Sequence, residues 1–269
     1  YDFEKKILSK NLNPETYIPH FFCFGQYEID NAKIYNVNIK KFYKEGSINT
    51  ANFFYYLKKN HKKIIKDKYD ICLISEPAFG ENERYKASGV EEGYGRMANY
   101  TVKFAKKFNH KFIFAAKRAK KSSLYPSDLY KKEINFFKTH LDKENFEFLL
   151  DNINPKENFF SSYTAIFQSK VAVGTQSTLL RDKIGVGEKI LSCNLTGLKI
   201  QDFPINGICK INNCSYEQFE ERLTEIMNIP INKYFEKIDK HRNYVMEFKN
   251  PFRTIDAVKE KIDKILKRL

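Results

Sequence analysis

The chain has 269 residues, of which 42% are hydrophobic, with 24 Phe and 17 Tyr, and it carries a formal net charge of +14. This composition predicts a globular protein with a packed core, arranged as one large domain or two small ones. The sequence contains no run of about 18 apolar residues and no secretory leader pattern, so we expect neither a membrane span nor a signal peptide in it.

The first part of the chain alternates short apolar runs with a polar segment. Residues 21–24 and 41–43 are typical of strands, and residues 27–35 between them are typical of a helix. Residues 1–64 therefore resemble the remnant or end of one α/β unit and a linker into a second one.

The middle of the chain repeats a pattern of strand followed by helix. Most of the strand-like runs are continuously apolar, which suits strands that are buried on both faces. They are residues 69–75, 111–116, 146–150, 170–174, 189–193 and 208–211. Apolar residues spaced three and four apart over 97–108 predict one intervening helix, and a capping box at Ser215 and Gln218 predicts another. This order favours an α/β fold with a doubly wound, mostly parallel, Rossmann-like sheet over residues 65–250, followed by a packing helix over 251–269.

Ligands of such sheets bind outside the carboxyl ends of the strands, and polar residues gather at three of these ends. Ser75 and Glu76 follow the first strand and open a loop of about 18 residues, a length that is usually functional or disordered. Glu76 is a candidate base, nucleophile or ribose ligand, with a solvated acidic loop as the alternative. Lys117 and Arg118 follow the second strand and suit a phosphate, although a generic basic loop has the same composition.

The third strand end carries the most informative segment. Five residues stand where a strand passes into a helix: Gly174, Thr175, Gln176, Ser177 and Thr178. A glycine allows close approach of the backbone to a ligand, and the first turn of a helix offers unpaired N–H groups to an anion such as a phosphate. An ordinary helix cap at Ser177 or Thr178 is the alternative. Tyr163 and Asn194 complete the candidate nucleotide site.

Several other kinds of site are not indicated. The chain lacks the GxxxxGK[ST], GxGxxG, GxSxG and HExxH motifs, and its histidines lack the spacing of metal ligands. The five cysteines have no CxxC spacing, which predicts reduced core residues of a cytoplasmic protein. The lysine-rich segments favour solvated helix faces over nucleic-acid contacts, and a peripheral contact with anionic lipid at the inner membrane stays open.

The segment SSYTAIFQSKVAVGTQSTLLRDKIGVGEKIL at residues 161–191 resembles the nucleotide-binding C-terminal half of GT-B glycosyltransferases, and the strands at 69–75 and 111–118 fit the same order. The similarity is greatest to bacterial enzymes of surface polysaccharide, lipopolysaccharide and capsule synthesis, including Kdo transferases. The resemblance implies a metal-independent transferase without a cofactor, whose substrates are a nucleotide sugar and a glycan or glycolipid acceptor. It places the donor phosphate at residues 174–178, with Lys117 and Arg118 offsetting its charge and Glu76 as the catalytic candidate.

One departure from the family pattern bears on the donor. Many such enzymes carry a glutamate in the helix after the phosphate turn, whereas this chain has Arg181 and Asp182 there. That leaves room for a CMP-linked acidic sugar, whose carboxylate Arg181 or Arg118 would meet. Only about 60 residues precede the first strand of the nucleotide-binding half, so a fragment or reduced form of such an enzyme is expected. The alternatives are a nucleotide-sugar epimerase, a polyol-phosphate transferase and a basic nucleic-acid-binding module.

Overall fold

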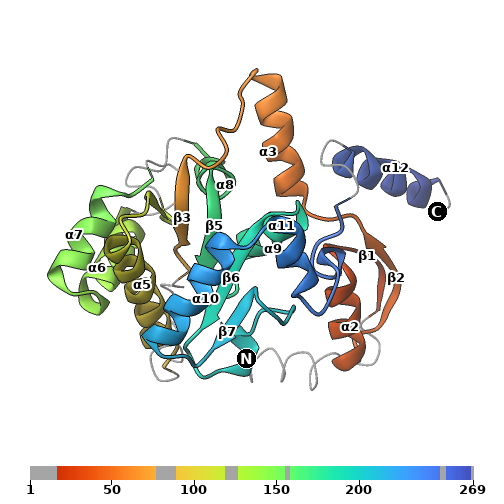
Figure 1. Cartoon of the computed structure of the whole chain (residues 1–269). Coiled ribbons are helices and arrows are strands. Elements are labelled where there is room, and N and C mark those ends of the chain that lie inside the picture. Colours follow the sequence, from red (N-terminus) through yellow and green to blue (C-terminus); the bar gives the residue numbers. More distant parts are fainter. Residues whose placement is uncertain (1–16, 77–88, 119–126, 155–157, 249–252, 268–269) are drawn as a thin grey trace. The chain divides into compact units, whose positions relative to one another are not determined.

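The computed structural model describes residues 17–76, 89–118, 127–154, 158–248 and 253–267 (Figure 1). Its internal contacts divide the chain into two compact units. The larger unit is Ile64–Asp239, and the smaller one combines Tyr1–Lys63 with Lys240–Leu269.

The larger unit is built on a five-stranded parallel sheet with the strand order β4-β3-β5-β6-β7. Its strands are β3 (Tyr69–Ile74), β4 (Phe112–Ala115), β5 (Ser169–Gly174), β6 (Lys189–Asn194) and β7 (Lys210–Asn212). In the central register Cys72 lies opposite Ile113 on one side and Ala172 on the other. Ile71, Cys72 and Leu73 are fully buried, which is the burial on both faces that their apolar run predicts.

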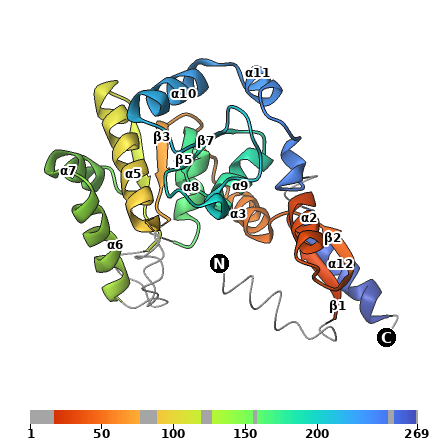
Figure 2. The same ribbon diagram turned by 90° about the horizontal axis from the view of Figure 1, so that it is seen from below.

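Helices cover both faces of this sheet. α5 (Val90–Lys107) and α10 (Tyr216–Asn228) contact each other and the strands β5 and β6, while α8 (Ser161–Phe167) and α9 (Thr178–Gly185) pack together against β5 (Figure 2). The remaining elements of the unit are α6 (Ser127–His140), α7 (Lys143–Asp151), the 3₁₀ helix η1 (Lys199–Gln201) and α11 (Ile231–Glu236). The predicted α/β fold with a parallel sheet is therefore confirmed. The capping box at Ser215 and Gln218 is also present at the start of α10.

Two local predictions are wrong. Residues 146–150, expected as a strand, lie in α7, where the Asp142 side chain accepts a hydrogen bond from the Asn145 N–H at 2.8 Å and starts the helix. Burial there falls on Asn145 and Leu149, four residues apart, so the short apolar run follows the helical period.

The second error concerns the loop expected after Glu76. α5 begins at Val90, so the end of that loop, including Gly93 and Gly95, is helical, while residues 77–88 lie outside the described part of the chain. A Cβ at Gly93 would clash with the backbone of Thr196, and one at Gly95 would clash with the His140 ring. These two glycines therefore serve close packing of a helix, where their sequence pattern indicated a loop.

The smaller unit contains a parallel pair of strands, β1 (Ile18–Cys23) and β2 (Ile39–Lys44). Its helices are α2 (Gln26–Ile34), α3 (Ile48–Lys59), the 3₁₀ helix η2 (Arg242–Tyr244) and α12 (Thr254–Leu266). α12 packs on α3, and the Tyr27 ring contacts the Tyr244 ring edge-on at 6.1 Å. This unit is thus assembled from both ends of the chain.

Candidate functional site

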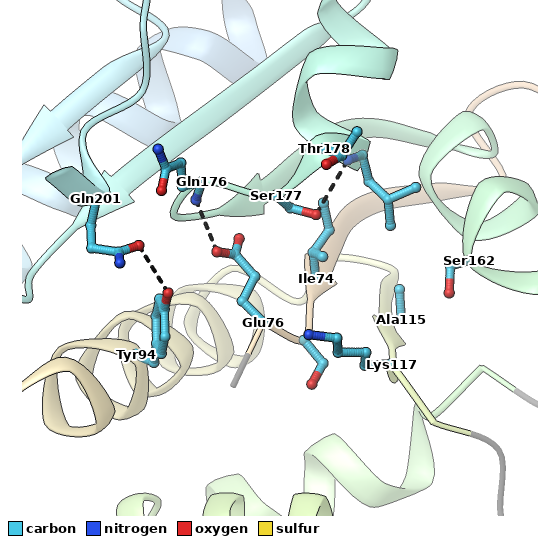
Figure 3. Close-up of a pocket in the computed structure, with 12 residues that line it drawn as sticks. Ile74, Glu76, Tyr94, Ala115, Lys117, Ser162, Gln176, Ser177, Thr178 and Gln201 are labelled. Carbon is cyan, nitrogen blue, oxygen red and sulfur yellow. Dashed lines mark hydrogen bonds between the residues drawn. The ribbon is translucent and has the colours of Figure 1, made fainter. Parts of the chain in front are cut away.

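A pocket of about 410 Å³ opens at the carboxyl ends of β3, β4 and β5. Because the three strands are parallel neighbours, the polar residues that follow them meet at one edge of the sheet. Figure 3 shows the convergence of the lining side chains, which are Ile74, Ser75, Glu76, Tyr94, Ala115, Lys117, Ser162, Gln176, Ser177, Thr178, Leu179 and Gln201. All of them belong to the larger unit.

The side chain of Glu76 lies on the turn formed by residues 174–178 (Figure 3). Its Oε1 accepts a hydrogen bond from the Thr175 N–H at 2.5 Å, and its Oε2 accepts one from the Gln176 N–H at 2.9 Å. Burial raises the pKa of this carboxyl, while the N–H groups of Thr175, Gln176 and Ser177 and the charge of Lys117 act in the opposite direction. The N–H groups that the sequence assigns to a phosphate therefore hold a carboxylate of the same chain.

Gly174 is required by this contact. A Cβ at Gly174 would clash with Oε1 of Glu76, and it would lie 3.4 Å from Cδ1 of Leu180. The absence of a side chain thus opens the space that the Glu76 carboxylate fills. The group that lies against this glycine in the structure is the Glu76 carboxylate.

The rest of the turn is fixed by side-chain hydrogen bonds to backbone. Ser177 is the N-cap of α9, and its Oγ accepts a hydrogen bond from the Leu179 N–H at 3.2 Å. The Thr175 hydroxyl donates to the Cys193 carbonyl at 3.1 Å, which ties the turn to β6. Gln176, Ser177 and Thr178 all line the pocket.

The loop after β4 is held by Glu133, a fully buried residue of α6. Its carboxylate accepts hydrogen bonds from the N–H of Lys117 at 2.7 Å and of Arg118 at 2.9 Å, and also one from the Ser75 hydroxyl. The Arg118 guanidinium lies 4.0 Å from the same carboxylate. Sequence analysis missed Glu133 because a single glutamate in an amphipathic helix carries no local signal of what it will contact.

Among the residues that the structure describes, Lys117 is the cation that lines the pocket, and Arg118 is not among the lining residues. Burial and the charge of Arg118 lower the pKa of the Lys117 amine, and the carboxylates of Glu133 and Glu76 oppose that shift. The doublet predicted from sequence is therefore divided: one side chain faces the pocket, and the other lies beside the anchoring carboxylate.

The far side of the pocket is formed by Tyr94 of α5 and Gln201 of η1. The Tyr94 hydroxyl donates to Oε1 of Gln201 at 3.0 Å (Figure 3). Ser162 of α8 lines the pocket as well. These three residues were not predicted, because only the folded sheet brings α5, α8 and η1 to the same strand ends.

Five of the predicted residues lie outside the pocket lining, namely Arg118, Tyr163, Gly174, Thr175 and Asn194. The Tyr163 hydroxyl donates to Oδ2 of Asp182 at 3.2 Å, and both side chains are buried. Asn194 donates to the Leu198 carbonyl at 2.9 Å and to Oδ1 of Asp202 at 2.6 Å. It therefore shapes the loop that leads to η1.

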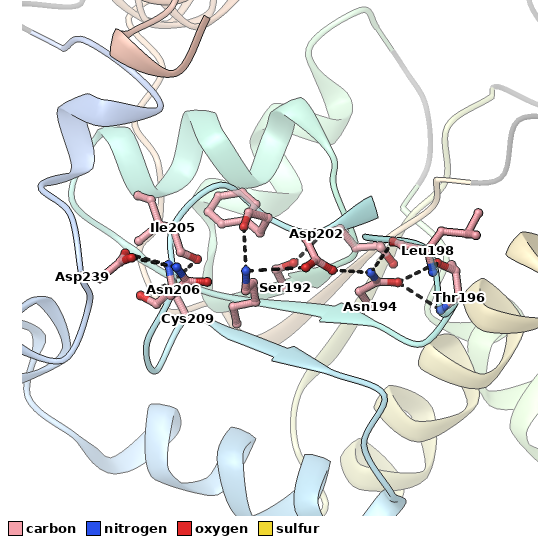
Figure 4. Close-up of polar contacts among 12 residues, drawn as sticks. Ser192, Asn194, Thr196, Leu198, Asp202, Ile205, Asn206, Cys209 and Asp239 are labelled. Carbon is pink, nitrogen blue, oxygen red and sulfur yellow. Dashed lines mark hydrogen bonds and ion pairs between the residues drawn. The ribbon is translucent and has the colours of Figure 1, made fainter. Parts of the chain in front are cut away.

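Figure 4 shows the rest of the Asn194 network. Oδ1 of Asn194 accepts hydrogen bonds from the N–H and the hydroxyl of Thr196, at 3.0 and 2.7 Å. The Thr196 hydroxyl in turn accepts one from the Leu198 N–H at 3.1 Å. The connection through Asn194 to Gln201 is thus fixed by side-chain amide and hydroxyl groups.

Within the described ranges, no cluster of three or more His, Cys, Asp or Glu side chains has the arrangement of a metal site. Among the same residues, no helix combines the length and apolar character needed to cross a bilayer. The five cysteines are all buried and unpaired as disulfides.

Residues 126–250 match the model of a protein family described as "putative O-antigen biosynthesis protein". The matched segment runs from α6 to beyond η2, so it includes Glu133, the 174–178 turn and Gln201. Glu76, Tyr94 and Lys117 precede it. No curated protein matches the chain.

The solved structures that are similar to this chain include two enzymes whose names refer to nucleotide sugars. One is UDP-GlcNAc 2-epimerase from Neisseria meningitidis bound to UDP-GlcNAc, with 13% sequence identity and a TM-score of 0.46 over 91% of this chain. The other is the E. coli ADP-heptose lipopolysaccharide heptosyltransferase II, with 9% identity and a TM-score of 0.36 over 67% of this chain. The matches cover 60% and 52% of those two proteins, respectively.

Proposed function

We propose that this protein is a metal-independent glycosyltransferase of surface-polysaccharide synthesis, and that its nucleotide-sugar donor binds in the pocket at the carboxyl ends of β3, β4 and β5. The observation that carries the proposal is the composition of that pocket, which combines a helix N-terminus, hydroxyl groups and one lysine. The match of residues 126–250 to a family of O-antigen synthesis also supports a role in surface-polysaccharide synthesis.

The chemistry of the pocket suits a nucleotide. Its volume of about 410 Å³ lies within the roughly 300–1,000 Å³ that is usual for small-molecule sites. The 174–178 turn and the Lys117 amine would take the phosphate groups, because backbone N–H groups and a point charge stabilise negative charge. Tyr94 and Gln201 would contact the base or the ribose through their polar atoms.

The transfer step needs stabilisation of a leaving phosphate. N–H groups of the 174–178 turn and the Lys117 amine would stabilise the charge that develops on that phosphate as the bond to the sugar breaks. The sugar would pass to a hydroxyl of a glycan or glycolipid acceptor. We keep Glu76 as the candidate base of this step, since it is the carboxylate that lines the pocket together with these groups.

For the donor we propose a CMP-linked acidic sugar. Binding of CMP is to be measured under the same conditions as binding of UDP and GDP. Arg118 and Arg181 do not line the pocket, so Lys117 is the cation placed to meet a sugar carboxylate. Peripheral contact with an anionic membrane would bring the enzyme to a glycolipid acceptor. The net charge of +14 would favour that contact through attraction to anionic lipids.

The first experiment is a thermal-melting screen with CMP, UDP, GDP, CDP and ADP on the wild type and on Lys117→Met. We expect one nucleotide to raise the melting temperature of the wild type and to lose most of that effect in the variant. Lys143→Met is the matched control, because Lys143 is exposed at the start of α7. No rise with any nucleotide, together with steeply salt-dependent binding of DNA or RNA, would contradict the proposal and favour a nucleic-acid-binding module.

A second assay separates transfer from the epimerase and polyol-phosphate alternatives. The protein is incubated with the sugar form of the nucleotide that binds, with and without a glycan acceptor, and the products are identified by mass spectrometry. A glycosyltransferase enlarges the acceptor by one sugar residue. Conversion of the donor to an isomeric sugar without an acceptor would instead indicate an epimerase, and addition of a polyol phosphate would indicate the other transferase.

A further inference from the structure

We propose that Glu76 is an internal competitor for the donor phosphate: its carboxylate occupies the N–H groups of the 174–178 turn, and anion binding there requires it to leave. The inference rests on the proposed function, which places the phosphate at that turn. It adds a residue that sets the affinity of the site and makes this affinity depend on pH.

The geometry makes the two anions mutually exclusive. Both oxygens of Glu76 are engaged, Oε1 by the Thr175 N–H and Oε2 by the Gln176 N–H. Such hydrogen bonds from N–H groups to an ionised carboxylate are stronger than those to neutral acceptors. A phosphate needs the same N–H groups, so it cannot use them while Glu76 remains in place.

The carboxylate also has room to leave. Glu76 lies two residues beyond the end of β3, and its side-chain carboxylate accepts hydrogen bonds from the N–H groups of the turn. The pocket of about 410 Å³ lies beside it, and the Lys117 amine there attracts its charge. Rotation of the side chain would therefore free the turn without moving the backbone of β3 or β5.

Competition of this kind has a quantitative consequence. The apparent affinity for an anion equals the intrinsic affinity multiplied by the fraction of molecules in which the turn is free. Protonation of Glu76 weakens it as an acceptor, so anion affinity should rise as the pH falls. Burial raises the pKa of this carboxyl above its ordinary value. Among the described residues, the Lys117 amine acts on the charge of Glu76, and Arg118 and Glu133 act in turn on Lys117.

The test uses the full chain and two probe anions, sulfate and pyrophosphate. Sulfate keeps its charge between pH 5 and pH 8, so a change in its affinity reports on the protein. Binding is followed through the amide NMR signals of Thr175 and Gln176, which locate the anion at the turn. The variant is Glu76→Gln, and the matched control is Glu92→Gln, at an exposed position in the first turn of α5.

We expect Glu76→Gln to bind both anions more tightly than the wild type at pH 7.5, by about tenfold if the turn is free in about a tenth of wild-type molecules. We also expect the wild type and Glu92→Gln to gain sulfate affinity as the pH falls, and Glu76→Gln to lose that pH dependence. Equal or weaker anion binding by folded Glu76→Gln would overturn the inference. If this variant does not fold, a sulfate affinity of the wild type that is flat between pH 5 and pH 8 would overturn it, and a rise toward low pH would support it.

The nucleotide screen on the same proteins keeps the two proposals apart. If sulfate and pyrophosphate behave as expected and no nucleotide binds, the proposed function fails while the competition at the turn stands. If a nucleotide binds the wild type and binds Glu76→Gln equally or less tightly, the inference fails while the donor site stands.

Discussion

The carboxylate of Glu133 accepts a hydrogen bond from the backbone N–H of Lys117 at 2.7 Å, across 16 positions of sequence. Glu133 is fully buried in α6, and Lys117 lies in the loop after β4. The same carboxylate binds the next N–H along the chain and the Ser75 hydroxyl. One buried acid thus fixes two strand ends beside the pocket.

Removal of the Glu133 carboxylate should destabilise the protein. Glu133→Ala leaves two part-buried N–H groups and the buried Ser75 hydroxyl without this acceptor, so we expect the free energy of unfolding to fall by about 2 to 3 kcal/mol. Glu133→Gln keeps one acceptor oxygen and should lose about 1 kcal/mol. Urea denaturation measures both. Glu147→Ala on the exposed face of α7 should change stability by less than about 0.5 kcal/mol. A Glu133→Ala variant as stable as that control would show that Glu133 does not anchor the loop.

Tyr94 should affect nucleotide affinity more than stability. Tyr94→Phe removes the hydroxyl that donates to Gln201 and so frees the Gln201 amide to rotate. We expect nucleotide binding to weaken by about five- to tenfold, since a net hydrogen bond contributes about 1 kcal/mol. Tyr100→Phe is the matched control on the same helix, because the Tyr100 ring packs on Tyr216 and Phe219. Equal losses in the two variants would remove Tyr94 from the binding site.

Asp70 should make stability depend on pH in the acidic range. Burial raises the pKa of Asp70, but the ion pair with Lys170 at 2.7 Å, the Lys111 N–H and the charge of His110 outweigh it, so the pKa is lowered overall. A lowered pKa in the folded state means that the contribution is present above the unfolded value of about 3.9 and is lost as the pH falls through the folded value.

Asp70→Asn should therefore be about 1 kcal/mol less stable than the wild type at pH 6, and the difference should shrink toward zero below about pH 3. Denaturation curves at several pH values measure this difference. Asp151→Asn, at the exposed end of α7, should show none. A difference between Asp70→Asn and the wild type that stays constant with pH would contradict the assignment.

Lys183 should matter for stability and not for binding. Its buried amine donates to the carbonyls of Ile166 and Ser169 at 2.6 and 2.8 Å and to Glu188 at 2.7 Å, near the amino ends of β5 and β6. Lys183→Met leaves the carbonyls of Ile166 and Ser169 without this donor, so we expect a loss of about 1 to 3 kcal/mol in the free energy of unfolding. Below the melting transition its nucleotide affinity should equal that of the wild type. Weaker binding by the folded variant would mean that the two edges of the sheet are coupled.

The sequence pattern predicted the sheet because its strands are buried on both faces and so are continuously apolar. The apolar pattern predicted the wrong element at residues 146–150. A run of five apolar residues fits the period of a strand or of a helix, and the Asp142 side chain caps a helix there. The 174–178 turn could be found because glycine, hydroxyl residues and the strand-to-helix change lie next to one another in the chain. Glu133, Tyr94 and Gln201 could not, because their contacts form only after distant elements pack.

Glu76 shows the same limit of sequence-based prediction, although it was one of the predicted site residues. Its position at a strand end predicted that it would lie near the 174–178 turn. Its carboxylate accepts hydrogen bonds from the N–H groups of that turn because of the rotamer of its side chain and the open space at Gly174. Local sequence determines neither of these.

A calorimetric titration of the nucleotide selected in the melting screen, into the wild type and Lys117→Met, tests the donor site most directly. We expect one binding site per chain in the wild type and an affinity about 10- to 100-fold lower in Lys117→Met, because a hydrogen bond to a charged group contributes about 1.5 to 3 kcal/mol. Lys143→Met and Lys183→Met should bind like the wild type. Equal affinity in Lys117→Met and the wild type would place the nucleotide elsewhere and contradict the account.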